Sequence, residues 1–153
     1  MIIAGPSRDI EILRARITAS FASQGLMSTL KAELAHVSAG AVEIVLKPGG
    51  HVSQQHGFVH AGAISAIADT AAGYAALSLM PEGKGVLTTE FKINLLAPAV
   101  GDLVRAKGRV IKAGRTLTLA QTDVFAEVGG QQKLVAFLTA TLMTMDGREG
   151  IKD

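Results

Sequence analysis

The residue of this sequence that most needs a chemical explanation is Asp69. It lies near the middle of the stretch from Ala61 to Met80, whose other residues are mainly Ala, Gly and larger apolar types. Burial among apolar side chains disfavours the charged form of a carboxylate, and acids in such surroundings are frequent at functional sites. Asp69 is therefore a candidate catalytic group. The structural alternative is that Asp69 only makes hydrogen bonds at a close packing contact.

The stretch from Ala61 to Met80 is expected to form one helix with a stripe of small residues. At about 100° per residue, the stripe lies on or beside the face of Asp69. Its members are Gly62, Ser65, Ala66, Ala72, Gly73 and Ala76. Such a stripe allows close approach to a sheet or a second helix. Residues 60–63 are expected to form the helix N-terminus, whose unpaired N–H groups can hold a carbonyl oxygen or an oxyanion.

Three of the four histidines, His51, His56 and His60, lie in the loop before this helix. Their spacing matches no standard zinc signature, and the chain has no Cys that would complete one. We therefore expect no metal, and a metal-dependent hydrolase built on these histidines is the remote alternative. The chain also lacks a phosphate-binding loop and a dinucleotide fingerprint, so no cofactor is expected.

Alternating basic residues, from Arg105 to Arg109, mark one face of a predicted strand at residues 102–112. With a three-residue turn at 113–115, Arg105 is expected to lie opposite Asp123. This arrangement favours a solvated ladder of charges between strands. A phosphate contact near the turn is the alternative.

The elements that must position these residues follow from periodicity. Apolar residues at helical spacing predict an amphipathic N-terminal helix at residues 8–23. Two short apolar runs, 30–37 and 41–47, flank a turn signal and predict a hairpin. Alternation with a period of two predicts four further strands. These strands are 87–95, 102–112, 116–128 and 133–145.

No linker, repeat or change in composition interrupts this order of elements. The order predicts one α+β domain over residues 1–153, with its core at about 28–145. The central helix is apolar on all sides and must be covered on most of them. An antiparallel six-stranded sheet wrapped around the long central helix is the simplest cover.

Composition excludes several classes of protein. The 153 residues include 48% hydrophobic residues, which are enough to bury a core. The net charge of +2, the 4% aromatic content and the absence of Trp argue against a nucleic-acid partner. The lack of Cys excludes disulfides and a thiolate nucleophile. A short apolar N-terminus and the acid at position 69 predict no export and no membrane span, so a cytoplasmic location is expected.

Gln54, His60 and Asp69, in the loop and the central helix, have a spacing that together is typical of one protein family. His60 follows Gln54 by six residues and precedes Asp69 by nine. Together with the order of elements, this pattern resembles the hotdog-fold acyl-CoA thioesterases of the phenylacetate-pathway type, over about residues 28–145. That family has an Asn or Gln, then a His-Gly-Gly helix start, then an Asp or Glu. The resemblance implies the hotdog fold.

The resemblance also implies catalytic roles. Asp69 corresponds to the general base or nucleophile that attacks the thioester or activates water. Gln54 corresponds to the amide near the reacting carbonyl or water, and the backbone N–H of Ala61 to the donor that polarises the carbonyl. His60 corresponds to the family histidine at the helix start. Ala61 replaces the first Gly of the family motif, and the combination of Gln54 with Asp69 mixes two branches of the family, which leaves the acyl group open.

Two further residues are expected to contact the substrate, Gly62 and Thr88. Thr88 corresponds to a hydroxyl residue that often holds the water in this family. Strict alternation along the strand also places Thr88 on the polar face with Glu90 and Lys92. Simple placement at the surface is therefore the alternative for Thr88.

The chemistry of thioester hydrolysis requires two chains. Ala61 and Asp69 are separated by about 12 Å along one helix, so a single helix cannot hold one carbonyl from both sides. Two antiparallel helices related by a two-fold axis would bring Asp69 of one chain to the helix start of the other. We therefore expect an acyl-CoA or aryl-CoA substrate and a homodimer with shared sites, assembled into a homotetramer.

Alternatives remain open for the function and for the acyl pocket. A non-catalytic hotdog protein that binds an acyl or aryl ligand would use Asp69 only at its interface. No motif of a hydratase on the same fold is present. Phe58, Tyr74 and Phe91 are candidates for lining an acyl pocket, and core packing is the alternative for each of them.

Overall fold

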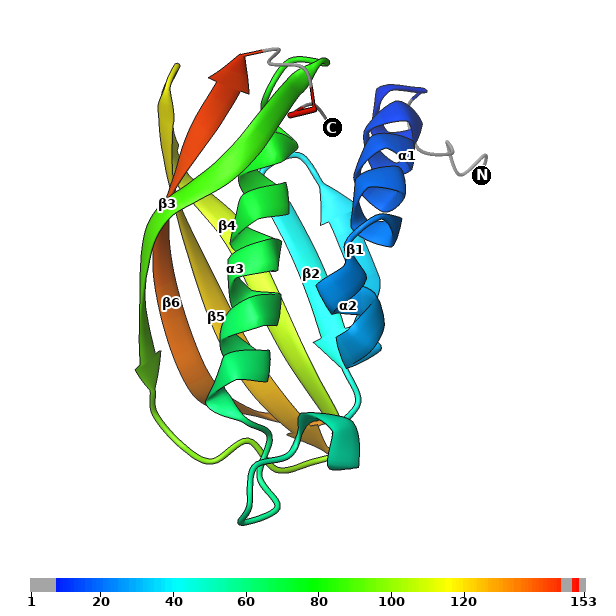
Figure 1. Ribbon diagram of the computed structural model, residues 1–153, viewed down its shortest axis with the longest axis vertical. Helices are drawn as coiled ribbons and strands as arrows, with labels where there is room; N and C mark the ends of the chain where they lie inside the picture. Colours follow the sequence, from blue (N-terminus) through cyan, green and yellow to red (C-terminus); the bar gives the residue numbers. More distant parts are fainter. Residues whose placement is uncertain (1–7, 147–149, 152–153) are drawn as a thin grey trace, which may run out of the picture.

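The computed structural model describes residues 8–146 and 150–151. In this part of the chain, a layer of helices lies against one antiparallel sheet (Figure 1). The helices are α1 (Arg8–Ala22), α2 (Gly25–Leu30), the short 3-10 helix η1 (Gly50–Val52) and α3 (Ala61–Leu77). The strands are β1 (Glu33–Ser38), β2 (Ala41–Leu46), β3 (Lys84–Leu95), β4 (Leu103–Ala113), β5 (Leu117–Val128) and β6 (Gln131–Asp146).

The sheet has six strands in the order β1-β2-β4-β5-β6-β3, and every neighbouring pair is antiparallel. It curves around α3, while α1 and α2 lie beside β1 (Figure 1). The predicted architecture of a six-stranded antiparallel sheet around a central helix is confirmed. No helix among the described residues is both long enough and apolar enough to cross a membrane.

The central helix lies very close to the sheet because the residues between them are small. A Cβ atom built on Gly108 of β4 would lie 2.5 Å from backbone atoms of Ala71. On the neighbouring strand, Thr122 Oγ1 donates a hydrogen bond of 2.9 Å to the carbonyl oxygen of Ala68. Both alanines are fully buried. These contacts determine the position of α3 on the sheet.

The end of α3 differs slightly from the prediction. The helix ends at Leu77, before the expected Met80. There the Ser78 hydroxyl donates to the carbonyl oxygen of Ala75 at 2.6 Å and accepts from the Gly40 N–H at 2.7 Å. Ser78 therefore connects the helix terminus to the turn between β1 and β2.

The prediction of a strand over residues 30–37 is wrong at its start. Residues Gly25–Leu30 form α2, and β1 begins only at Glu33. Met27 and Leu30 are both buried, and their spacing of three residues suits a helix. Lys31 then ends α2 in the left-handed conformation with φ of 54°. The apolar run therefore belongs to two elements.

The strict alternation predicted for residues 87–95 is also wrong, because β3 contains a β-bulge. The register against β6 shifts between Thr88 and Glu90. As a result Thr88 pairs with buried Leu142 and faces the helix, whereas Glu90 faces away. Phe91 beyond the bulge returns to the helix side, opposite buried Ala140. The bulge thus separates Thr88 from the polar face on which alternation placed it.

The predicted pairing of Arg105 with Asp123 is wrong. β4 contains a β-bulge, and the turn between β4 and β5 comes later in the chain than predicted. Both change the register, so that Arg105 lies opposite Phe125. The guanidinium group donates to Glu127 at 2.6 Å and to Glu43 at 3.1 Å. The strand face is therefore a ladder of charges, as expected, with different partners. The strand predicted at 87–95 begins three residues earlier, at Lys84, and the remaining predicted strands differ from the observed ones by at most two residues at either end.

We expect the substitution Gly108→Ala to destabilise the fold. The added methyl group must displace the backbone of α3 at Ala71, and overpacking of this kind costs about 1–3 kcal/mol. Gly25→Ala is the matched control, because a Cβ atom there meets nothing within 4 Å. Urea unfolding of both variants measures the difference. Equal unfolding free energies would contradict the close approach of α3 to β4.

Candidate functional site

The carboxylate of Asp69 is partly buried on the face of α3 that adjoins β3. Thr88 Oγ1 donates a hydrogen bond of 2.8 Å to Asp69 Oδ1. Burial raises the pKa of the Asp69 carboxyl above its ordinary value, and the hydrogen bond from Thr88 opposes this increase. A carboxylate with a raised pKa is a stronger base than an ordinary one. The position and the basicity of Asp69 therefore suit proton abstraction or attack on a carbonyl carbon.

A cavity of about 320 Å³ lies beside Asp69. Its walls come from the α1–α2 junction, from α3 and from the first half of β3. The lining residues are Gln24, Asp69, Thr70, Gly73, Tyr74, Val86, Leu87 and Thr88. The cavity combines two apolar side chains with five polar ones. It can therefore hold a small group that has a polar part.

The helix start is capped by the side chain of His60. Its Nδ1 atom accepts a hydrogen bond of 2.8 Å from the Gly62 N–H. A neutral imidazole that accepts at Nδ1 carries its proton on Nε2. A Cβ atom at position 62 would lie 3.0 Å from Nδ1, so a glycine gives the ring room. The spacing of His60 and Gly62 is thus explained by the cap.

The cap leaves one donor of the helix start without a partner. The N–H groups of Ala63 and Ile64 donate to the carbonyl oxygen of His60, at 3.0 and 3.2 Å. The Gly62 N–H is taken by the imidazole. For the Ala61 N–H, no acceptor exists in the described part of the chain. This donor, at the positive end of the helix dipole, is available to a carbonyl oxygen or an oxyanion.

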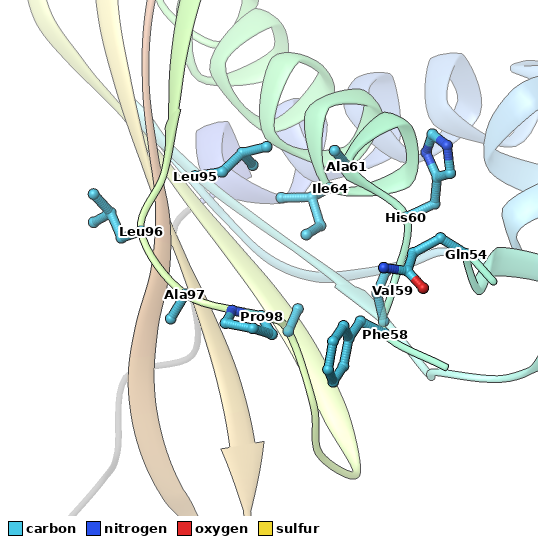
Figure 2. Close-up of a pocket in the computed structure, with 11 residues that line it drawn as sticks. Gln54, Phe58, Val59, His60, Ala61, Ile64, Leu95, Leu96, Ala97 and Pro98 are labelled. Carbon is cyan, nitrogen blue, oxygen red and sulfur yellow. The ribbon is translucent and has the colours of Figure 1, made fainter. Parts of the chain in front are cut away.

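Gln54 is held in a tight turn before the helix. Its backbone N–H donates to the carbonyl oxygen of Phe58 at 2.8 Å, and its carbonyl oxygen accepts from the Gly57 N–H at 3.0 Å. The side-chain Oε1 accepts from the His56 N–H. The amide nitrogen of Gln54 is then left as a donor. Figure 2 shows this amide beside the helix start, between Phe58 and His60.

Gln54 and the helix start line a second cavity of about 450 Å³ (Figure 2). Most of its walls are apolar, and they come from the loop before α3, from α3 and from the segment after β3. The lining residues are Gln54, Phe58, Val59, His60, Ala61, Ile64, Leu95, Leu96, Ala97, Pro98 and Ala99. Of the three predicted aromatic residues, only Phe58 lines it. Tyr74 is 3% exposed and borders the Asp69 cavity, and Phe91 is 47% exposed on β3.

The expected site residues therefore form two groups in one chain. Gln54, His60 and Ala61 meet at the larger cavity, and Asp69 meets Thr88 at the smaller one. Gly62 lines neither cavity, and its N–H is occupied by His60. The two groups are separated by the distance along α3 from Ala61 to Asp69, which is about 12 Å.

The three loop histidines do not converge. His51 Nε2 lies 3.2 Å from the carbonyl oxygen of Leu30, whereas His60 caps the helix. Within residues 8–146 and 150–151, no cluster of three His, Asp or Glu side chains has a geometry that could hold a metal ion. The alternative of a metal-dependent hydrolase on these histidines thus has no geometric support in the described residues.

Sequence reasoning missed Gln24, which lines the Asp69 cavity. Gln24 Nε2 donates a hydrogen bond of 2.8 Å to the Tyr74 hydroxyl, across 50 positions of sequence. No local pattern around Gln24 indicates this contact, because it depends on how α1 and α2 pack against α3. Only the tertiary structure brings Gln24 to the cavity.

Comparison with known proteins gives a consistent picture. A model of the thioesterase superfamily matches residues 56–133, just over half of the chain. A thioesterase family protein from Silicibacter pomeroyi is 43% identical, with a TM-score of 0.86, and the match covers 88% of this chain and 99% of that one. A candidate esterase of Halobacterium salinarum is 36% identical over 70 residues, 44% of this chain. The match spans 46% of that relative, just under half its length.

Two more distant structures share the fold. A thioesterase from Haemophilus influenzae is 23% identical, with a TM-score of 0.79, and the match covers 97% of this chain and 99% of that one. The E. coli PaaI protein of the phenylacetic acid degradation operon is 20% identical, also with a TM-score of 0.79, over 94% of this chain and 97% of that one. The matched family region contains His60, Ala61, Asp69 and Thr88, and begins just after Gln54. The chain therefore belongs to the thioesterase superfamily and has the hotdog fold of its structural relatives.

Proposed function

We propose that this protein hydrolyses acyl-CoA or aryl-CoA thioesters to a free acid and CoA, at sites shared between two copies of the chain. One observation carries the proposal. Asp69 is a partly buried carboxylate with a raised pKa, and it faces a cavity that contains neither Gln54 nor Ala61. A candidate base and a candidate oxyanion donor thus lie at two different cavities, and one chain does not bring them together.

A two-fold axis beside α3 and β3 would complete the site. β3 is an edge strand of the sheet and carries exposed apolar side chains, namely Leu87, Phe91 and Leu95. An uncovered apolar edge strand is a site of association. Antiparallel pairing of β3 with β3 of a second copy would cover this edge and set the two α3 helices side by side. Asp69 of one copy would then lie beside the helix start of the other.

In the proposed site, the thioester carbonyl lies between the two chains. Its oxygen accepts from the Ala61 N–H of one chain, and the Gln54 amide of that chain donates to the carbonyl or to the water. Asp69 of the other chain removes a proton from water, whose oxygen attacks the carbonyl carbon. The C–S bond then breaks, and CoA leaves as the thiolate and takes up a proton. Direct attack by Asp69, followed by hydrolysis of the anhydride, is the other route that this geometry supports.

Several neighbours would position these groups. His60 occupies the N–H of Gly62 and so leaves the Ala61 N–H as the available donor. Thr88 orients the Asp69 carboxylate through its hydroxyl group. We also propose assembly into a homotetramer in the cytoplasm, as the resemblance implies. For Gly62 we propose no direct contact with the substrate, unlike the expectation from the sequence. The absence of its side chain leaves space for the imidazole of His60.

The substitution Asp69→Asn tests the catalytic role proposed for this carboxylate. Loss of the base or nucleophile should lower kcat/KM for CoA esters by about 10²–10⁴-fold. Because burial raises the pKa of Asp69, the folded chain binds this proton more tightly than the unfolded chain, and the ionised carboxylate lowers stability at pH values above that pKa. The variant should therefore unfold at a higher temperature at neutral pH.

The matched control for this experiment is Asp123→Asn, because Asp123 lies on β5 outside both cavities. It should leave hydrolysis unchanged. Equal rates for Asp69→Asn and the wild type would remove the catalytic role. Tight binding of a CoA ester by the wild type without release of CoA would favour a binding protein instead.

Sharing of the site predicts complementation between two inactive variants. Gln54→Ala and Asp69→Asn chains are refolded together in equal amounts. Random pairing gives half heterodimers, each with one intact site and one doubly altered site, so about a quarter of the wild-type activity should return. Heterodimers that form without activity would show that Gln54 and Asp69 do not act across an interface.

The hydrogen bond from Thr88 predicts a change in pH dependence. This bond lowers the pKa of Asp69, so Thr88→Val should raise it further. Hydrolysis requires the ionised carboxylate, and the acid limb of the kcat/KM profile should therefore move to higher pH. Thr89→Val is the control, because the Thr89 hydroxyl donates to the carbonyl oxygen of Thr141. An unshifted acid limb in Thr88→Val would contradict Asp69 as the titrating base.

A further inference from the structure

The cavity beside Asp69 has a polar wall that comes from the N-terminal segment. Gln24 lies between α1 and α2 and is the N-cap residue of α2, but its side chain makes no capping bond. The Gln24 amide nitrogen donates instead to the hydroxyl of Tyr74, at 2.8 Å. Ser20 Oγ lies 3.1 Å from the same hydroxyl. The amide of Gln24 is thus held in one orientation by a buried tyrosine.

This orientation leaves the Gln24 carbonyl oxygen as an acceptor at the cavity. In the part of the chain that the structure describes, no group donates a hydrogen bond to Gln24 Oε1. Gln24 is only partly buried, so this oxygen is accessible to water. A ligand that displaces the water must replace its hydrogen bond, or the acceptor is left unpaired at a cost in binding free energy.

Asp69 and Gln24 line the same cavity, and Gly73 lines it as well. Gly73 lies one helical turn beyond Asp69, and a Cβ atom there would meet no atom outside its own helix within 4 Å. Tyr74, which holds Gln24, is five residues beyond Asp69, about 7.5 Å along the helix axis. Val86 and Leu87 of β3 form the apolar side of the same cavity. A short acyl group could therefore extend from the carbonyl at Asp69 along Gly73 to Gln24.

We infer that the Asp69 cavity is the acyl subsite and that Gln24 selects acyl groups with a hydroxyl or another hydrogen-bond donor at their far end. The inference rests on the proposed function, since it assumes that the reacting carbonyl lies at Asp69. A site built to hydrogen-bond a substrate hydroxyl discriminates against the analogue that lacks it, because its polar group is left unpaired. The volume of about 320 Å³ is at the small end for ligand pockets and suits a short acyl chain or a single ring.

The test uses matched pairs of substrates. Straight-chain acyl-CoA esters of increasing length are each compared with the ω-hydroxy ester of the same length, and CoA release gives kcat/KM for both. The wild type should prefer the hydroxy ester at one length. In Gln24→Leu, the ratio of the two kcat/KM values should fall by about 3–10-fold at that length, the usual worth of one neutral hydrogen bond. Gln131→Leu, an exposed glutamine outside both cavities, is the control and should keep the wild-type ratio.

A second variant keeps the test valid if Gln24→Leu does not fold. Tyr74→Phe retains the ring, whose centroid lies 6.2 Å from that of Phe21, and removes only the hydroxyl that orients Gln24. The hydroxy preference should fall in this variant too. Wild-type protein that hydrolyses no CoA ester would overturn the proposed function. Wild-type protein that hydrolyses plain and hydroxy esters equally, or variants that keep the preference, would overturn the role of Gln24 alone.

Discussion

The close approach of α3 to the sheet determines where Asp69 and the N-terminus of α3 lie. Gly108 and the Thr122 hydroxyl bring strands β4 and β5 against the backbone of Ala71 and Ala68. Asp69, the next residue after Ala68, then lies on the helix face towards β3, where the Thr88 hydroxyl donates to its carboxylate. Because α3 is one continuous helix, its position on the sheet also places its N-terminus, where Ala61 lines the larger cavity.

The placement of Asp69 opposes the stability of the fold. Burial of an ionised carboxylate is unfavourable, and the raised pKa of Asp69 expresses this cost. The β-bulge in β3 supplies the compensation, since it turns Thr88 towards the helix and provides one hydrogen bond. One hydroxyl offsets only part of this cost, so the pKa of Asp69 stays raised. A carboxylate whose charge is fully compensated by hydrogen bonds would have a lower pKa and would be a weaker base.

The sequence predicts the central helix and the succession of six strands along the chain, because each depends on short-range periodicity, whereas the roles of the candidate site residues come from the family resemblance. It does not predict the bulge at Thr89, since a bulge follows from how two distant strands pair. It also assigns Leu30 to a strand, although Leu30 and Met27 are buried on one face of α2. The contact between Gln24 and Tyr74 joins residues 50 positions apart, so only the tertiary fold reveals it.

The residues proposed to carry the reaction and the residue proposed to select the acyl group come from different parts of the chain. Gln54, His60 and Asp69 lie in one short segment, where the spacing of a loop and a helix is enough to place them. The Gln24 acceptor lies outside that segment, on a junction that reaches the cavity only through packing. A junction between two helices can change without disturbing α3 or the edge strand β3. A shared motif can therefore preserve the chemistry of the family while the preferred acyl group differs between its members.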